Sequence, residues 1–63
     1  MLYFIAVSNS SLYMTGFVVD KGNSHKVTID IRKATPYTVF KDADEAAKKF
    51  GLECYAILSN CVG

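Results

Sequence analysis

The sequence predicts a small α+β domain, in which an antiparallel sheet of four to five strands carries one short helix, Ala43 to Phe50, on one face. Three observations predict this fold. Apolar segments rich in β-branched and aromatic residues are separated by turn residues, which is typical of strands. One segment carries the start and stop signals of a helix. A chain of 63 residues suffices for one domain only, residues 1–63. The expected order is three strands, an optional fourth, the helix and a last strand.

The first two predicted strands are apolar on both faces. Residues Leu2 to Val7 are apolar at nearly every position, which is typical of a strand covered on both sides. After the turn-like residues 8–11, the segment Leu12 to Val19 is apolar on both alternating sets. Gly16 interrupts it, and a glycine inside a strand indicates a bulge or the close approach of another backbone.

The third segment is predicted to fold back on the second as a hairpin. Residues Asp20 to Asn23 (DKGN) tolerate positive φ and suit the turn of such a hairpin. Residues 24–32 then alternate, with one face carrying His25, Val27, Ile29 and Ile31 and the other Lys26, Thr28, Asp30 and Arg32. This alternation predicts a strand with one face in water.

Two further strands are expected on either side of the helix. Pro36 bends or ends the segment before it, and Tyr37 to Phe40 are expected to form a short edge strand at most, because proline in a sheet is confined to edges and strand starts. Residues Glu53 to Leu58 are expected to form the last strand, followed by a loose end at residues 60–63.

The helix Ala43 to Phe50 is predicted from its two ends. Asp42 is expected to be the N-cap, with Glu45 three residues later in the position of a capping box. Gly51 follows the last helical residue, as expected for a C-terminal residue with positive φ, and Leu52 can fold back on the helix to complete a Schellman motif.

This helix is too small to cover the predicted sheet. Its inward side chains are three alanines and one phenylalanine, and the aromatic residues in surplus are Tyr3, Tyr13, Phe17 and Tyr55. Two interpretations stay open. The sheet curls strongly and fills both faces with its own side chains, or these four residues form a surface that binds a partner protein or a second copy, since large bare apolar patches mark interfaces. A two-fold homodimer is the simplest such assembly.

No catalytic or metal-binding pattern is evident, so we expect no enzyme activity and no cofactor. His25 and Cys54 are interpreted as a core-edge histidine and a buried cysteine, because free cysteine is commonly just buried. His25, Cys54 and Cys61 lack the ligand spacing of zinc motifs. Asp42 and Glu45 are assigned to capping, and the four glycines are scattered, unlike those of a phosphate-binding loop.

Composition limits location and partners. The chain is 51% hydrophobic and 13% aromatic, which excludes a disordered tail, and its formal charge of +1 gives no overall attraction to nucleic acid or to an anionic membrane. The apolar run LYFIAV is too short for a signal peptide or a membrane span. We therefore expect a cytoplasmic protein without a membrane partner.

A nucleic-acid-binding domain is the alternative. The fragment TGFVVDK resembles part of the aromatic strand motif of RNA-recognition domains, in which rings on a sheet stack on bases. A local basic rim of Lys26, Arg32 and Lys33 would then contact the phosphates.

Residues Ala34 to Leu58 resemble a pattern found in small bacteriophage- and prophage-encoded proteins, in which a hairpin is followed by a short strand, an acidic cap, a helix, a glycine and a last strand. The matching residues are Ala34, Phe40, Asp42, Glu45, Ala46 and Gly51. The resemblance implies an accessory protein that binds and inhibits a host protein or a defence complex in the bacterial cytoplasm. The sequence thus favours a non-enzymatic, self-associating protein-interaction module, with a small nucleic-acid-binding domain as the alternative.

Overall fold

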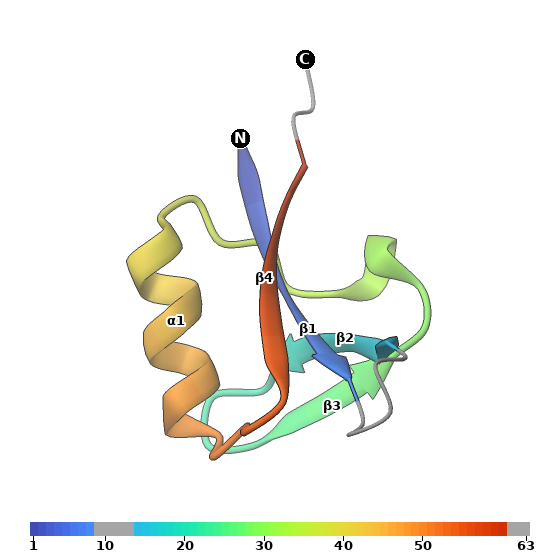
Figure 1. The fold of residues 1–63 in the computed structure, drawn as a ribbon, viewed down its shortest axis with the longest axis vertical. Helices are drawn as coiled ribbons and strands as arrows, with labels where there is room; N and C mark the ends of the chain where they lie inside the picture. The colour runs from blue at the N-terminus through green and yellow to red at the C-terminus, as the bar shows by residue number, and fades with distance from the viewer. Residues whose placement is uncertain (9–13, 61–63) are drawn as a thin grey trace.

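The computed structural model describes residues 1–8 and 14–60 and confirms the predicted α+β fold. Within these residues four strands form one antiparallel sheet in the order β3-β2-β1-β4 (Figure 1). The strands are β1 (Leu2–Ser8), β2 (Met14–Asp20), β3 (His25–Thr28) and β4 (Tyr55–Asn60). The helix α1 (Phe40–Lys49) packs on one side of the sheet, and a short 3₁₀ helix, η1 (Ile31–Lys33), lies on the other side (Figure 1).

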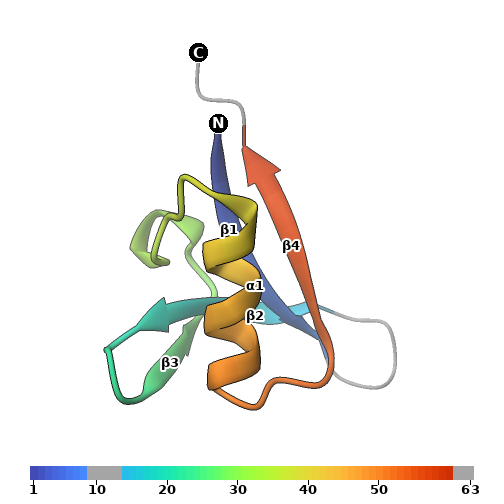
Figure 2. The ribbon, with the colours of Figure 1, turned by 90° about the vertical axis from the view of Figure 1, so that its left-hand side faces the viewer.

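The central strand β1 has two different neighbours along its β2 edge. It pairs with β4 over Leu2 to Val7, but with β2 only over Ala6 to Ser8. Nearer its start, the N–H of Tyr3 donates to the carbonyl of Tyr37 at 2.7 Å, and the N–H of Tyr37 donates to the carbonyl of Tyr3 at 2.9 Å. The edge strand expected at Tyr37 to Phe40 is therefore not formed. Only Tyr37 pairs with β1, in a single bridge to Tyr3, and Phe40 already belongs to α1. Since β2 diverges from β1, β2 and β3 run across the direction of β1 and β4 (Figure 2).

The close approach predicted at Gly16 is confirmed. The register between β1 and β2 shifts at Val7 and Ser8, directly opposite Gly16, as in a β-bulge. A Cβ on Gly16 would lie 2.5 Å from Cγ1 of Val27 and 2.7 Å from the carbonyl oxygen of Thr28. The absence of a side chain here lets β2 and β3 pair.

The predicted hairpin between the second and third strands is also confirmed. The N–H of Lys21 donates to the carbonyl of Ser24 at 2.9 Å, and the N–H of Gly22, whose φ is 88°, donates to Oδ1 of Asp20 at 2.8 Å. The side chain of Asp20 thus closes the turn, as aspartate commonly does at this position.

The long alternating strand predicted for residues 24–32 is wrong in its second half. β3 ends at Thr28, Ile29 is 89% exposed, and Ile31 begins η1. Oδ1 of Asp30 accepts the backbone N–H of Arg32 at 3.0 Å and so caps η1. This local side-chain hydrogen bond competes with strand pairing, and here it prevails over the alternation.

The C-terminus of α1 forms the predicted Schellman motif. Gly51 has a φ of 73°, its N–H donates to the carbonyl of Lys48 at 3.1 Å, and the N–H of Leu52 donates to the carbonyl of Ala47 at 3.1 Å. Leu52 packs against the core, which completes the motif.

The predicted N-terminus of the helix is wrong. α1 begins at Phe40 rather than Ala43, its N-cap is Val39 without a side-chain hydrogen bond, and Asp42 lies in the first turn instead of capping. The carbonyl of Val39 already accepts the N–H of Asp42, and the Phe40 ring lies edge-on to that of Tyr3 with centroids 5.9 Å apart. The first residue of the helix thus packs against Tyr3 of β1.

The core lies between α1 and the sheet. Its buried members are Ile5, Val18, Ala43, Ala46 and Ala47. Because alternate residues of a strand face opposite sides, Phe4 and Ala6 lie on the other side of β1, and they are also buried. The central strand is therefore covered on both faces, as its uninterrupted apolar sequence predicted.

Candidate functional site

The predicted partner-binding aromatics do not share one uncovered face. Tyr3 and Tyr55 are half-buried and pack against the core beneath α1. Phe17 pairs with Ala6 and so lies on the opposite side of the sheet, where it is half-buried. Tyr13 lies outside the described residues. The three described residues thus belong to two faces, and each is already in part covered by the fold itself.

Tyr55 links β4 to α1. Its hydroxyl donates to Oδ1 of Asp44 at 2.7 Å, and Oδ2 of Asp44 lies 3.0 Å from Nζ of Lys48, one turn further along the helix. The Tyr55 hydroxyl and then Lys48 hold the pKa of the Asp44 carboxyl below its ordinary value. The same hydrogen bond raises the pKa of Tyr55. We interpret this contact as structural.

The outer edge of β4 is open along the described part of the chain. In the sheet, β4 is hydrogen-bonded to β1 alone. The N–H of Ser8 donates to the carbonyl of Cys54 at 2.9 Å, so Cys54 faces β1. Because this direction alternates in an antiparallel pair, Tyr55, Ile57 and Ser59 direct their backbone N–H and C=O groups away from β1.

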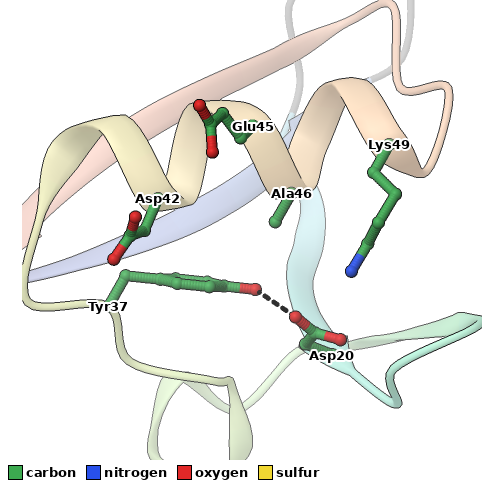
Figure 3. Close-up of a pocket in the computed structure, with 6 residues that line it drawn as sticks. All are labelled: Asp20, Tyr37, Asp42, Glu45, Ala46 and Lys49. Atoms are coloured by element: carbon green, nitrogen blue, oxygen red, sulfur yellow. Dashed lines mark hydrogen bonds between the residues drawn. The ribbon is translucent and has the colours of Figure 1, made fainter.

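A first hollow, the acidic hollow, lies between α1 and the end of β2. Its volume is about 250 Å³, and its lining residues are Asp20, Tyr37, Asp42, Glu45, Ala46 and Lys49 (Figure 3). The hydroxyl of Tyr37 donates to Oδ2 of Asp20 at 2.9 Å. Lys49 is the last residue of α1, and its Nζ lies 4.8 Å from the centroid of the Phe50 ring.

Asp20 and Tyr37, two of the residues that line the acidic hollow, serve the fold. The backbone N–H of Gly22, and after it the Tyr37 hydroxyl, hold the pKa of Asp20 below its ordinary value despite the opposing effect of burial. Burial, and then Asp20, raise the pKa of Tyr37 well above its ordinary range. Asp20 is thus a stable carboxylate that joins the β2–β3 turn to the segment before α1, and Tyr37 is held protonated.

A second hollow, the lysine hollow, lies beside the β2–β3 hairpin and η1. Its volume is about 350 Å³, and its lining residues are Val19, Lys21, Lys26, Val27, Thr28 and Lys33. Of the predicted basic rim, the structure brings Lys26 and Lys33 together. Arg32 lies outside this lining, since its Nε and Nη2 atoms donate to the two carboxylate oxygens of Asp30, each at 3.1 Å.

The remaining candidates for chemistry lie apart from both hollows. His25 is half-buried, and its ring lies 4.9 Å from that of Phe50, which fits the predicted core-edge position. Cys54 is exposed rather than buried, because it precedes β4 at the edge of the sheet. Over residues 1–8 and 14–60, no group of three or more histidine, cysteine or acidic side chains is arranged to hold a metal ion.

Sequence reasoning missed Lys21 and two hydrogen-bonded pairs of side chains. Lys21 lies in the predicted hairpin turn, and Lys26 lies on the strand that follows. The predicted hairpin could therefore have indicated that the two lysines lie close together. The contacts of Tyr37 with Asp20 and of Tyr55 with Asp44 join residues 17 and 11 positions apart. No local pattern predicts such pairs.

Comparisons with family models, curated proteins and solved structures found no match to this chain. The described residues form a small α+β fold, with an open sheet edge and the acidic and lysine hollows on its surface. In the part of the chain that the structure describes, no helix is long and apolar enough to cross a membrane.

Proposed function

We propose that the protein is a non-enzymatic interaction module that pairs with a second copy of itself through the open edge of β4. The observation that carries this proposal is the composition of that edge. Its residues, Tyr55–Asn60 (YAILSN), include no charged side chain and no proline. Natural proteins commonly protect edge strands with lysine, proline, bulges or short length, and β4 carries none of the side-chain protections.

The opposite edge supports the proposal by contrast. β3 has only four residues, and one of them is Lys26, which is exposed. Short length and an edge lysine are two of the devices that prevent pairing of sheets. The two edges of the same sheet thus differ, and the one free of such devices is the candidate docking site.

The outward backbone groups of β4 are self-complementary. They belong to Tyr55, Ile57 and Ser59, which are evenly spaced around Ile57. A two-fold axis beside Ile57 would place Ile57 opposite its own copy and Tyr55 of one chain opposite Ser59 of the other. The two sheets would then join into one continuous antiparallel sheet without a change in the fold of either chain.

Substitution of Ser59 tests this directly. Ser59→Pro removes one outward N–H and blocks the edge, but leaves the pairing of β4 with β1 intact, because proline is tolerated on the open side of an edge strand. Ser59→Ala retains the N–H and is the matched control. Sedimentation equilibrium over a concentration series that reaches the millimolar range should show a dimer for the wild type and for Ser59→Ala, and a monomer for Ser59→Pro. A wild-type monomer throughout, or equal association of both variants, would contradict the proposal.

Several expectations from the sequence stay predictions. They are the origin as a phage accessory protein that inhibits a host protein or a defence complex, the alternative of nucleic-acid binding, and the cytoplasmic location. A dimer through β4 would leave the acidic hollow, the lysine hollow and the outer surface of α1 free for such a partner.

A further inference from the structure

The lysine hollow concentrates positive charge that the chain as a whole does not have. Lys21, Lys26 and Lys33 come from the turn, from β3 and from η1, and all three side chains are exposed. The lining contains no carboxylate, although the protein carries six acidic and seven basic residues in all. None of the three lysines belongs to an ion pair of the described residues. The lining thus has three positive charges without a counter-charge, which an anion bound between them would supply.

Thr28 adds a neutral donor to this lining. Its Oγ1 accepts the backbone N–H of Asp30 at 3.2 Å. A hydroxyl that accepts a hydrogen bond in this way still has its own hydrogen to donate. The hollow therefore combines three ammonium groups with one hydroxyl, a donor set that suits an oxyanion with several acceptor atoms.

The size of the hollow indicates a ligand larger than a bare anion. Its volume of about 350 Å³ lies near the lower end of the range of about 300–1,000 Å³ for small-molecule sites. Val19 pairs with Lys26, so it lies on the same face of the sheet and supplies apolar surface beside the lysines. We propose that the lysine hollow binds the phosphate group of a phosphate ester of about nucleotide size, through Lys21, Lys26, Lys33 and the hydroxyl of Thr28.

Titrations of ¹⁵N-labelled protein followed by NMR test the proposal with three probes. These are inorganic phosphate, adenosine 5′-monophosphate, and a single-stranded oligothymidylate without terminal phosphates, each compared with sodium chloride at equal ionic strength. We expect saturable shifts at the amides of Lys26, Thr28 and Lys33 with the nucleotide. Tighter binding of the nucleotide assigns the site to free phosphate esters, and tighter binding of the oligonucleotide with a steep salt dependence assigns it to a nucleic-acid backbone.

Variants that each remove one positive charge distinguish binding in the lysine hollow from non-specific attraction of the anion to the protein. Lys26→Gln and Lys33→Gln should each weaken nucleotide binding by about tenfold, since each removes one charge-assisted hydrogen bond. Lys41→Gln removes the same charge from α1, outside the hollow, and should leave binding unchanged. If sodium chloride reproduces the shifts, or if Lys41→Gln weakens binding as much as Lys26→Gln does, the proposal is wrong. Because Ser59 and the edge of β4 are untouched, failure here is distinct from failure of the dimer.

Discussion

Single side chains decide where the backbone of this protein turns. Asp20 accepts the N–H of Gly22 and closes the hairpin, and Asp30 accepts the N–H of Arg32 and ends β3. Both are aspartates that bond to the residue two positions ahead, a local arrangement that favours turns over strands. The DKGN sequence made the first turn predictable. The turn at Asp30 was not predicted, because the alternation of apolar and polar residues continues to Arg32 although the strand ends at Thr28.

Two glycines should respond differently to substitution by alanine. Gly51 has a φ of 73° and open space within 4 Å of where a Cβ would lie, so Gly51→Ala should cost about 1 kcal/mol in unfolding free energy for conformational reasons alone. At Gly16 the Cβ would meet the backbone oxygen of Thr28 at 2.7 Å, and Gly16→Ala should cost more, about 1–3 kcal/mol. Urea denaturation of both variants, with Lys41→Ala as an exposed control, measures the order; equal midpoints for all three would contradict it.

The Tyr37 hydroxyl should contribute to stability in a pH-dependent way. Tyr37→Phe removes its hydrogen bond to Asp20 and should cost about 1 kcal/mol at neutral pH. Because the pKa of Tyr37 is raised in the folded protein, the unfolded chain releases this proton first, from a pH of about 10 upward. Its contribution is therefore complete below that pH and is lost as the pH rises further. Thermal unfolding between neutral and alkaline pH should show a shallower decline for Tyr37→Phe than for wild type, with Tyr55, whose pKa is also raised, contributing equally in both proteins.

At the scale of the elements, the two ends of α1 show what sequence can and cannot predict. The C-terminus was predicted correctly because the Schellman motif depends on consecutive residues, above all on Gly51 and Leu52. The N-terminus was placed three residues late, because Asp42 and Glu45 matched a capping box that the chain does not use. The ring of Phe40 contacts that of Tyr3, which is far away in the chain, so no local sequence pattern predicts this contact.

With the helix beginning at Phe40, Asp44 rather than Asp42 is the aspartate that connects the helix to the sheet. Asp42 is exposed in the first turn and caps nothing, whereas Asp44 binds Tyr55 of β4 and Lys48 of α1. Asp44→Ala should therefore lower the melting temperature by more than Asp42→Ala, which loses only a favourable charge near the helix N-terminus. The double variant Asp44→Ala, Tyr55→Phe should lose less than the sum of its single variants, because the two residues share one hydrogen bond. A larger loss for Asp42→Ala would restore the capping interpretation.

At the scale of the whole molecule, the antiparallel sheet and the order of its elements along the chain were within reach of the sequence, but the spatial order of the strands and the surfaces that it leaves open were not. Apolar runs and turns predicted the antiparallel sheet, and the excess of apolar residues posed the question of what covers it. The answer for β1 is that both faces are buried by the fold. The surfaces left open depend on which strands become edges and on where η1 places Lys33, and both follow from pairing between distant segments.

The difference between the two sheet edges leads to a residue-resolved prediction of hydrogen exchange. In dilute solution the outward amides of Tyr55, Ile57 and Ser59 should exchange quickly, while those of Ala56 and Leu58, which face β1, should be protected. If two copies pair through β4, raising the protein concentration should slow exchange at the three outward amides and leave β3 unchanged. Slower exchange on β3 instead would place the contact at the wrong edge. Slowing at all amides in equal proportion would indicate a gain in global stability without a defined contact, and would contradict pairing through β4.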